Sequence, residues 1–457
     1  MKVLLRGKLI CAACACLSLF LLTAGQAALA EVMTIDQAIE YALEHNPVVG
    51  MARENIEKSK AMVDQATSVG MPKLNAQGTY TRLDQVSEVS IGDRTVKLNE
   101  LDSQAANLSL SQPIDVFGVI KTGKHAAKLT KASSQHEYDQ AKNDTTLRVK
   151  EAYYAVLRAQ QFMDVQQKRV EQLEAHLQET RLHLKAGTAA PFDVLRAETE
   201  VADAKQGLIS AQNGVELAKA AFNNTLGRDL SAAVELDEPG PPQIVDLQLA
   251  SCLDSACTNR PEVLKMQSQQ ALAQDMVHIA RQGSKPQVNL NWQMNHSLST
   301  TMFNPRPSSW TAYLTVSMPV FDGGKTRAAV NQAKADANSV KLGYDQTVLA
   351  VKLDTQQAYL SLNESREKIS VAQKALEQAR ESMRLAQVRY KAGVSTQVEV
   401  FDAQTALTQA ETNHVNAVYD YYTALAQLEK AVGGRTQMAK LTESALKVAS
   451  ESVGDNR

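Results

Sequence analysis

The sequence predicts a mainly α-helical protein that also carries four β-strands long enough to cross a membrane. Residues 124–186 and 325–391 contain no proline and a single glycine, which favours two helices of unusual length. Four shorter stretches alternate apolar and polar residues, a pattern typical of strands. The same order of short motifs occurs twice along the chain, 206 residues apart over most of its length, which indicates an internal two-fold repeat.

Residues 1–30 have the pattern of a cleaved export signal. Three basic residues precede an apolar run, and the small residues Ala-Leu-Ala at 28–30 follow it. The run is short for a transmembrane anchor, and no convincing lipobox precedes a cysteine, which argues against a lipid anchor. We therefore expect a non-lipidated mature chain that begins near Glu31.

Charge and cysteine content restrict the partners and cofactors. Removal of the signal takes away three positive charges and no negative ones, so the net charge of −2 becomes −5, and nucleic acid is not expected as a partner. Cys252 and Cys257 remain in the mature chain. They form either a disulfide, which export permits, or two buried thiols, since an i,i+5 pair lies about 140° apart around a helix. The zinc spacing CxxC is absent after residue 30, and neither a metal site nor a cofactor is expected.

The repeat divides the mature chain into two structural units, 31–240 and 241–434, and a C-terminal tail, 435–457, which is expected to be partly disordered. The first unit is expected to contain a helix at 48–69, a strand hairpin at 74–114, a long helix at 124–186 and a returning helix at 191–226. The second is expected to contain helices within 247–282, a strand hairpin at 288–320, a long helix at 325–391 and a returning helix at 395–432.

Apolar residues recur every seven positions along the long and returning helices. In the second unit the two series are Leu362, Ile369, Leu376, Met383, Tyr390 and Val400, Leu407, His414, Tyr421, Leu428. A sustained seven-residue step indicates packing along a coiled-coil seam. Each long helix should therefore form a hairpin with its returning helix, and the motif Lys-Ala-Gly at 185–187 and 391–393 should form the tip.

The alternating stretches 74–83, 106–114, 288–298 and 310–320 approach the ~9–11 residues of a membrane strand. Four strands cannot close a barrel, and an open edge in lipid leaves backbone groups unpaired. Either the chain oligomerises, with twelve strands from three copies, or its strands form soluble hairpins. In a barrel at least one of two strand residues, Trp292 or Trp310, should lie at the lipid–water boundary; the alternative is core packing.

Other functions have less support in the sequence. It contains no motif of a serine hydrolase, a zinc metallopeptidase or a P-loop nucleotide-binding protein, and its eight histidines are scattered, so an enzyme is not expected. An exported coiled-coil scaffold without a pore remains an alternative. It explains the heptads and the repeat but not the four strands.

Several repeated motifs carry a family resemblance. They are Asn46-Pro47, SQPIDVFG at 111–118, SMPVFDGGK at 317–325, Leu-Gly at 226–227, and the tips KAGTAAPFDVLRAE and YKAGVSTQVEVFDAQ. In order and spacing they resemble the TolC-type outer-membrane factors of efflux pumps and type I secretion systems, over essentially the whole mature chain. The resemblance implies a homotrimer: a 12-stranded β-barrel in outer-membrane lipid continues into a long coiled-coil α-helical barrel in the periplasm. It also implies a periplasmic adaptor and an inner-membrane transporter as partners.

The resemblance also assigns roles to residues. The adaptor-docking tips would be Lys185, Ala186, Gly187, Thr188 and Lys391, Ala392, Gly393, Val394. The periplasmic gate would be Glu399, Asp402, Asp193 and Tyr390, although carboxylates near a helix N-terminus are also favoured by the helix dipole alone. Two departures matter: Ser395 replaces an arginine that helps latch some relatives, and Pro191 interrupts the first tip. These departures argue against a salt-bridged latch at Ser395, and whether the gate uses any such latch stays open.

Overall fold

The computed structural model describes residues 32–242, 244–298 and 306–443, so the expected signal lies outside the described residues. The chain forms two compact units. The helical unit comprises Met1–Pro47, Asp144–Val245 and Ala358–Leu428, and the strand-bearing unit comprises Val48–Asn143, Asp246–Gln357 and Glu429–Arg457.

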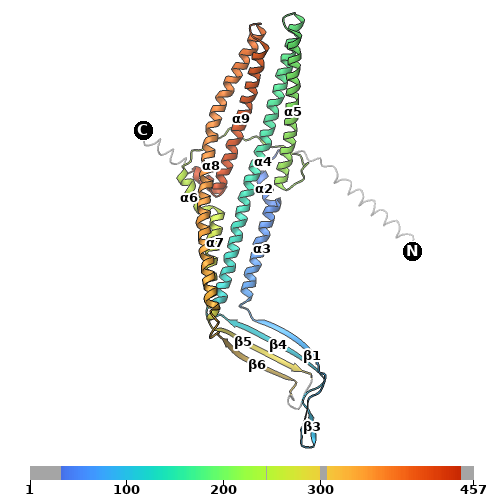
Figure 1. Ribbon diagram of the computed structural model, residues 1–457, viewed down its shortest axis with the longest axis vertical. Helices are drawn as coiled ribbons and strands as arrows, with labels where there is room; N and C mark the ends of the chain where they lie inside the picture. Colours follow the sequence, from blue (N-terminus) through green and yellow to red (C-terminus); the bar gives the residue numbers. More distant parts are fainter. Residues whose placement is uncertain (1–31, 243, 299–305, 444–457) are drawn as a thin grey trace, which may run out of the picture. The chain divides into compact units, whose positions relative to one another are not determined.

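Eight α-helices are described, labelled as in Figure 1. They are α2 (Ile35–His45), α3 (Pro47–Ser68), α4 (Val119–Lys185), α5 (Pro191–Leu226), α6 (Leu249–Asn259), α7 (Pro261–Arg281), α8 (Lys325–Lys391) and α9 (Gln397–Ala431). Both α4 and α8 run for 67 residues. Proline is absent from both, and the rare glycines, Gly123 and Gly343, are tolerated inside long helices. None of the described helices has the length and apolarity needed to cross a membrane.

Proline determines where α2 gives way to α3 and where α6 gives way to α7. Pro47 begins α3 and Pro261 begins α7, and the preceding residues, Asn46 and Arg260, are extended, with ψ of 126° and 130°. An extended residue before proline relieves the clash with its ring. The helix α2, which the sequence analysis did not single out, starts with a capping box between Thr34 and Gln37.

Two glycines pack closely against residues beside these breaks. Gly227 ends α5 with φ of 78°, and a Cβ there would lie 3.1 Å from the carbonyl oxygen of His45. Gly433 follows α9 with φ of 107°, and a Cβ there would lie 3.1 Å from Cβ of Asn259. At both positions a larger side chain would be costly, because φ is positive and a neighbouring residue lies close.

The core of the helical unit gathers around two aromatic residues, Tyr153 and Phe222, whose rings meet edge to face at 6.0 Å. The hydroxyl of Tyr153 lies 2.7 Å from the carbonyl oxygen of Asp237 and 3.1 Å from that of Met33. Burial raises the pKa of Tyr153 to about 12. The phenol therefore stays a neutral donor that ties the segment after α5 to the start of α2.

Four strands form one antiparallel sheet in the order β1-β4-β5-β6. They are β1 (Lys73–Arg82), β4 (Asp102–Ile114), β5 (Gln287–Ser297) and β6 (Ser308–Ser317). Within the chain β1 and β6 are the edge strands of this sheet (Figure 1).

The segment between β1 and β4, for which no strand was predicted, contains a further hairpin of β2 (Glu88–Ile91) and β3 (Arg94–Lys97). Gly92, with φ of 64°, supplies the left-handed residue that its tight turn requires.

Candidate functional site

The two hairpin tips have the same backbone geometry. Gly187 has φ of 77°, and its N–H donates to the carbonyl oxygen of Leu184 over 3.0 Å. The N–H of the next residue donates to the carbonyl oxygen of His183 over 2.9 Å. Gly393, with φ of 70°, donates to Tyr390, and the next residue donates to Arg389, over 2.9 and 3.1 Å. Both helices thus end in a Schellman motif, in which a left-handed residue lets two free carbonyls accept hydrogen bonds.

The residues predicted to dock an adaptor are exposed at these tips. They are Lys185, Ala186, Gly187 and Thr188 in the first tip and Lys391, Ala392, Gly393 and Val394 in the second. The space around the Cβ position of each tip glycine is empty of described atoms to 4 Å. A side chain added at either glycine would therefore point outward without disturbing the hairpin core.

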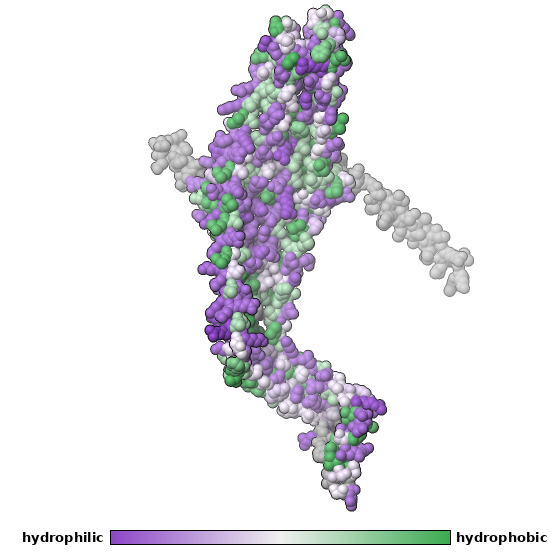
Figure 2. Space-filling view, viewed as in Figure 1, coloured by the Kyte–Doolittle hydropathy of each residue, from purple (hydrophilic) through white to green (hydrophobic). Residues whose placement is uncertain are grey.

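Apolar seams hold each hairpin together, as the heptads predicted. Between α4 and α5, Val170, Leu173 and Leu177 pack with Ala197, Val201 and Ala204. Between α8 and α9, Leu376 and Met383 pack with Val400 and Leu407, and Tyr390 contacts this cluster. Hydrophilic residues occupy much of the visible face of the helices (Figure 2).

The three predicted gate carboxylates have different surroundings. Asp193 accepts the backbone N–H of Ala190 over 3.0 Å, at the N-terminus of α5. Glu399 accepts the hydroxyl of Ser395 over 2.9 Å and lies 3.4 Å from Nη1 of Arg389. Asp402 is exposed on α9. Asp193 therefore also serves the helix-capping role that the sequence left open.

Several contacts join the second hairpin to the first. The hydroxyl of Tyr390 lies 3.3 Å from Oγ1 of Thr180, and the amide of Gln397 donates to the carbonyl oxygen of Asp193 over 3.0 Å. Nζ of Lys391 lies 3.9 Å from Glu179. Thr180 and Gln397 are buried, and the sequence analysis missed both because an isolated polar residue in a helical pattern predicts no contact.

Two ion pairs lie near the tips of the hairpins. Arg389–Glu399 links the two helices of the second hairpin, and Lys391–Glu179 links the two hairpins. Ser395 carries no charge, and its hydroxyl donates a hydrogen bond to Glu399. The basic side chains of both pairs are more than half exposed, so each pair contributes at most about 1 kcal/mol to the stability of the fold.

The sheet of the strand-bearing unit has two chemically distinct faces. The register places on one face the large apolar residues Leu74, Tyr80, Leu108, Leu110, Ile114, Val288, Leu290, Trp292, Met294, Trp310, Leu314 and Val316. On the other it places amide and hydroxyl residues, among them Asn75, Gln77, Thr79, Asn107, Ser109, Asn289, Asn291, Gln293, Asn295, Thr311 and Thr315. Both tryptophans lie on the apolar face, where Trp310 is 70% exposed and Trp292 is half-buried.

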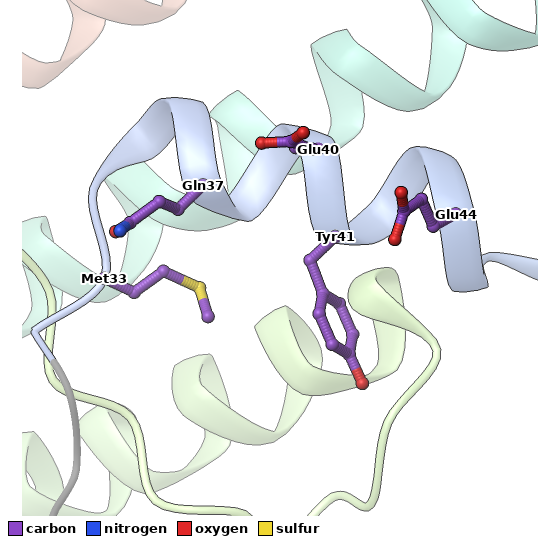
Figure 3. Close-up of a pocket in the computed structure, with 5 residues that line it drawn as sticks. All are labelled: Met33, Gln37, Glu40, Tyr41 and Glu44. Atoms are coloured by element: carbon purple, nitrogen blue, oxygen red, sulfur yellow. The ribbon is translucent and has the colours of Figure 1, made fainter.

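A surface pocket of about 280 Å³ lies along α2 (Figure 3). It is lined by Met33, Gln37, Glu40, Tyr41 and Glu44, and the side chains of Met33 and Tyr41 extend to the same side of the helix. The lining offers two carboxylates and a phenol but no nucleophile paired with a base, so the pocket does not suggest catalysis.

Both remaining cysteines are free thiols, with Cys252 buried and Cys257 half-buried. Both lie on α6, where an i,i+5 separation turns the two side chains about 140° apart. Burial raises the pKa of Cys252, which keeps this thiol protonated and unreactive. The structure thus has two free thiols, of which only Cys252 is buried.

Comparison with known proteins identifies the family. Residues 38–228 and 252–434 match the family described as outer membrane efflux protein. The pyoverdine export outer membrane protein OpmQ of Pseudomonas aeruginosa is 24% identical over 88% of this chain and 85% of its own length. The outer membrane protein TolC of Escherichia coli is 23% identical over 90% and 84%.

Solved structures agree with this assignment of the fold. The outer membrane protein VceC of Vibrio cholerae matches with a TM-score of 0.75 and 19% identity, over 88% of this chain and 96% of that structure. The relatives are outer-membrane channel and export proteins rather than enzymes, and the resemblance to TolC-type factors is confirmed. The chain therefore belongs to the outer membrane efflux protein family and is an outer-membrane channel with a periplasmic helical extension.

Proposed function

We propose that three copies of the chain form a passive duct, with the sheets closing as a 12-stranded barrel and the hairpins forming a gated periplasmic tunnel. The observation that carries this proposal is the sheet. It has an apolar face, a face of mainly amide and hydroxyl residues, and two edge strands left unpaired within the chain. In lipid, unpaired backbone groups cost several kcal/mol each, so copies gain stability by pairing β6 of one with β1 of the next.

The two faces fit opposite surroundings in such a barrel. The apolar face suits acyl chains, and the amide and hydroxyl face suits a water-filled lumen, as in known membrane barrels. Twelve strands is an even number within the range of single barrels. A coiled-coil scaffold in the periplasm would leave this apolar face exposed to water, which is why the duct is preferred.

The tips supply the proposed contacts and gate. The repeated Schellman geometry at Gly187 and Gly393 would give a trimer six similar docking positions for a periplasmic adaptor, itself joined to an inner-membrane transporter. Glu399, Asp402 and Asp193 would form the gate, and Tyr390 would hold the closed form through Thr180.

Trp310 provides a direct test of the membrane sheet. We expect its fluorescence to be quenched strongly by brominated lipids, because its ring is 70% exposed on the apolar face. The chain has only two tryptophans, so Trp310→Phe isolates the signal of Trp292, and Trp292→Phe isolates that of Trp310. If neither signal responds to the lipid-borne quencher while both respond to a water-soluble one, the sheet is not in the membrane. The result would then favour a coiled-coil scaffold without a pore.

A further inference from the structure

A buried histidine lies between the two hairpins, close to their tips. His176 of α4 is 7% exposed, and its ring centroid lies 4.8 Å from that of Tyr390 on α8 and 5.2 Å from that of Phe401 on α9. Its Nε2 atom is buried and lacks a hydrogen-bond partner among the described residues. A neutral ring tolerates such a site far better than a charged one, because an ion without a partner loses its hydration.

The ring of His176 also positions a residue of the proposed gate. Tyr390 is held on one side by His176 and on another by His183, whose ring lies 5.6 Å away, while its hydroxyl meets Thr180 at 3.3 Å. All three partners belong to α4. This aromatic cluster therefore joins the second hairpin to the first, together with the contacts of Gln397 and Lys391.

We propose that His176 positions Tyr390 and acts as a pH-sensitive lock, whose protonation releases the α8–α9 tip from α4 and opens the gate. This inference rests on the proposed gating at the tips and adds its regulation. It adds a second element to the gate carboxylates, because His176 lies in the packing between the hairpins rather than in the lumen.

The charged groups nearby do not supply a partner for a protonated ring. They are His183 and Glu179 on α4, Asp193 and Arg196 on α5, Arg389 and Lys391 on α8, and Glu399 and Asp402 on α9. Glu179 and Glu399 are already paired with Lys391 and Arg389, and the guanidinium of Arg196 lies over the ring of Phe401, 5.6 Å from its centroid. Among the described residues no carboxylate, Asp193 and Asp402 included, forms an ion pair with His176, so a charged ring would have no counter-ion in the packed form.

The direction of the pH effect follows from burial. Burial, reinforced by the charge of His183, lowers the pKa of His176 to about 4, whereas a solvated imidazole has a pKa of about 6.5. The released tip thus binds a proton more readily than the packed tip. Packing is fully stable above about pH 6.5 and weakens as the pH falls toward 4. At pH 5 the ratio of released to packed tips should be roughly 30-fold higher than at pH 7.5.

Single-channel recording in planar bilayers tests the lock. For the parent protein we expect the ratio of open to closed time to rise at least about 30-fold from pH 7.5 to pH 5 on the tip side, since the released-to-packed ratio of each of the three tips rises by that factor. His176→Phe keeps an aromatic ring in the cluster but cannot be protonated, so its ratio should stay near the neutral value. His278→Phe, at an exposed histidine of α7, is the matched control and should respond like the parent. The gate carboxylates are present in all three proteins, so their titration cancels from the comparison.

Amide hydrogen exchange gives a readout that does not depend on conduction. After correction for the intrinsic pH dependence, residues 386–403 of the parent should lose protection at pH 5, and those of His176→Phe should not. Equal pH responses of these two proteins, in opening or in exchange, would overturn the lock and leave the duct intact. If none of the proteins conducts, the duct fails, and the exchange comparison still decides the role of His176.

Discussion

Replacing Gly393 with valine is expected to abolish export while leaving folded oligomers in the outer membrane. Gly393 has φ of 70°, and a β-branched residue at positive φ costs on the order of 1–3 kcal/mol. The strain would weaken the Schellman motif that shapes the tip. In this motif the N–H groups of residues 393 and 394 donate to the carbonyl oxygens of Tyr390 and Arg389. The space around its Cβ position is empty, so no core packing is lost.

Gly393→Asn is the matched control, because asparagine adopts the left-handed conformation at much lower cost. Export of a known pump substrate from cells that carry only the variant should be near zero for valine and largely retained for asparagine. Gly187→Val and Gly187→Asn provide the same comparison in the first tip, where φ is 77°. Normal export by both valine variants would show that the tips do not dock an essential partner.

The paired change Glu399→Ala with Asp402→Ala is expected to remove most of the cation selectivity of the channel. A trimer would gather three copies each of Glu399, Asp402 and Asp193, and a constriction lined by one sign of charge raises the local concentration of counter-ions at least about tenfold. The three carboxylates should contribute unequally to cation selectivity, because their surroundings differ. Asp193 caps a helix and Glu399 lies beside Arg389, so Asp402 should contribute most.

Single-channel conductance measures this directly. The parent should favour cations and be blocked by trivalent ions from the tip side, and the double variant should need about tenfold more of the blocking ion. Glu88→Ala with Asp93→Ala removes the same charge from the β2–β3 hairpin and should leave the block unchanged. If selectivity and block survive in the Glu399 and Asp402 variant, these carboxylates serve only the ends of their helices.

Features of the fold that depend on regular spacing could be predicted from the sequence. The heptads and the absence of proline predicted long helices, and α4 and α8 span 67 residues each. The alternation at 310–320 predicted a strand, and β6 spans Ser308–Ser317. The long helix was expected from residue 124, whereas α4 starts at Val119 and includes Gly123, because a glycine inside so long a helix costs only about 1 kcal/mol.

Features that depend on contacts between distant segments could not be predicted. His176 is one histidine among scattered ones, and only the packing of α8 and α9 against α4 buries its ring. The ion pair of Lys391 with Glu179 likewise joins residues more than 200 positions apart. The strands β2 and β3 were missed because four residues are too few for alternation to stand out from a polar loop.

The mass of the complex extracted from the outer membrane tests the central claim most directly. Each chain contributes a sheet with two unpaired edges, and closing a barrel of twelve strands requires three chains. Native mass spectrometry of the protein, extracted from outer-membrane fractions in mild detergent, should give a single species with the mass of three mature chains. A stable monomer or dimer from the same membranes would leave the sheet open in lipid and would contradict the proposed duct.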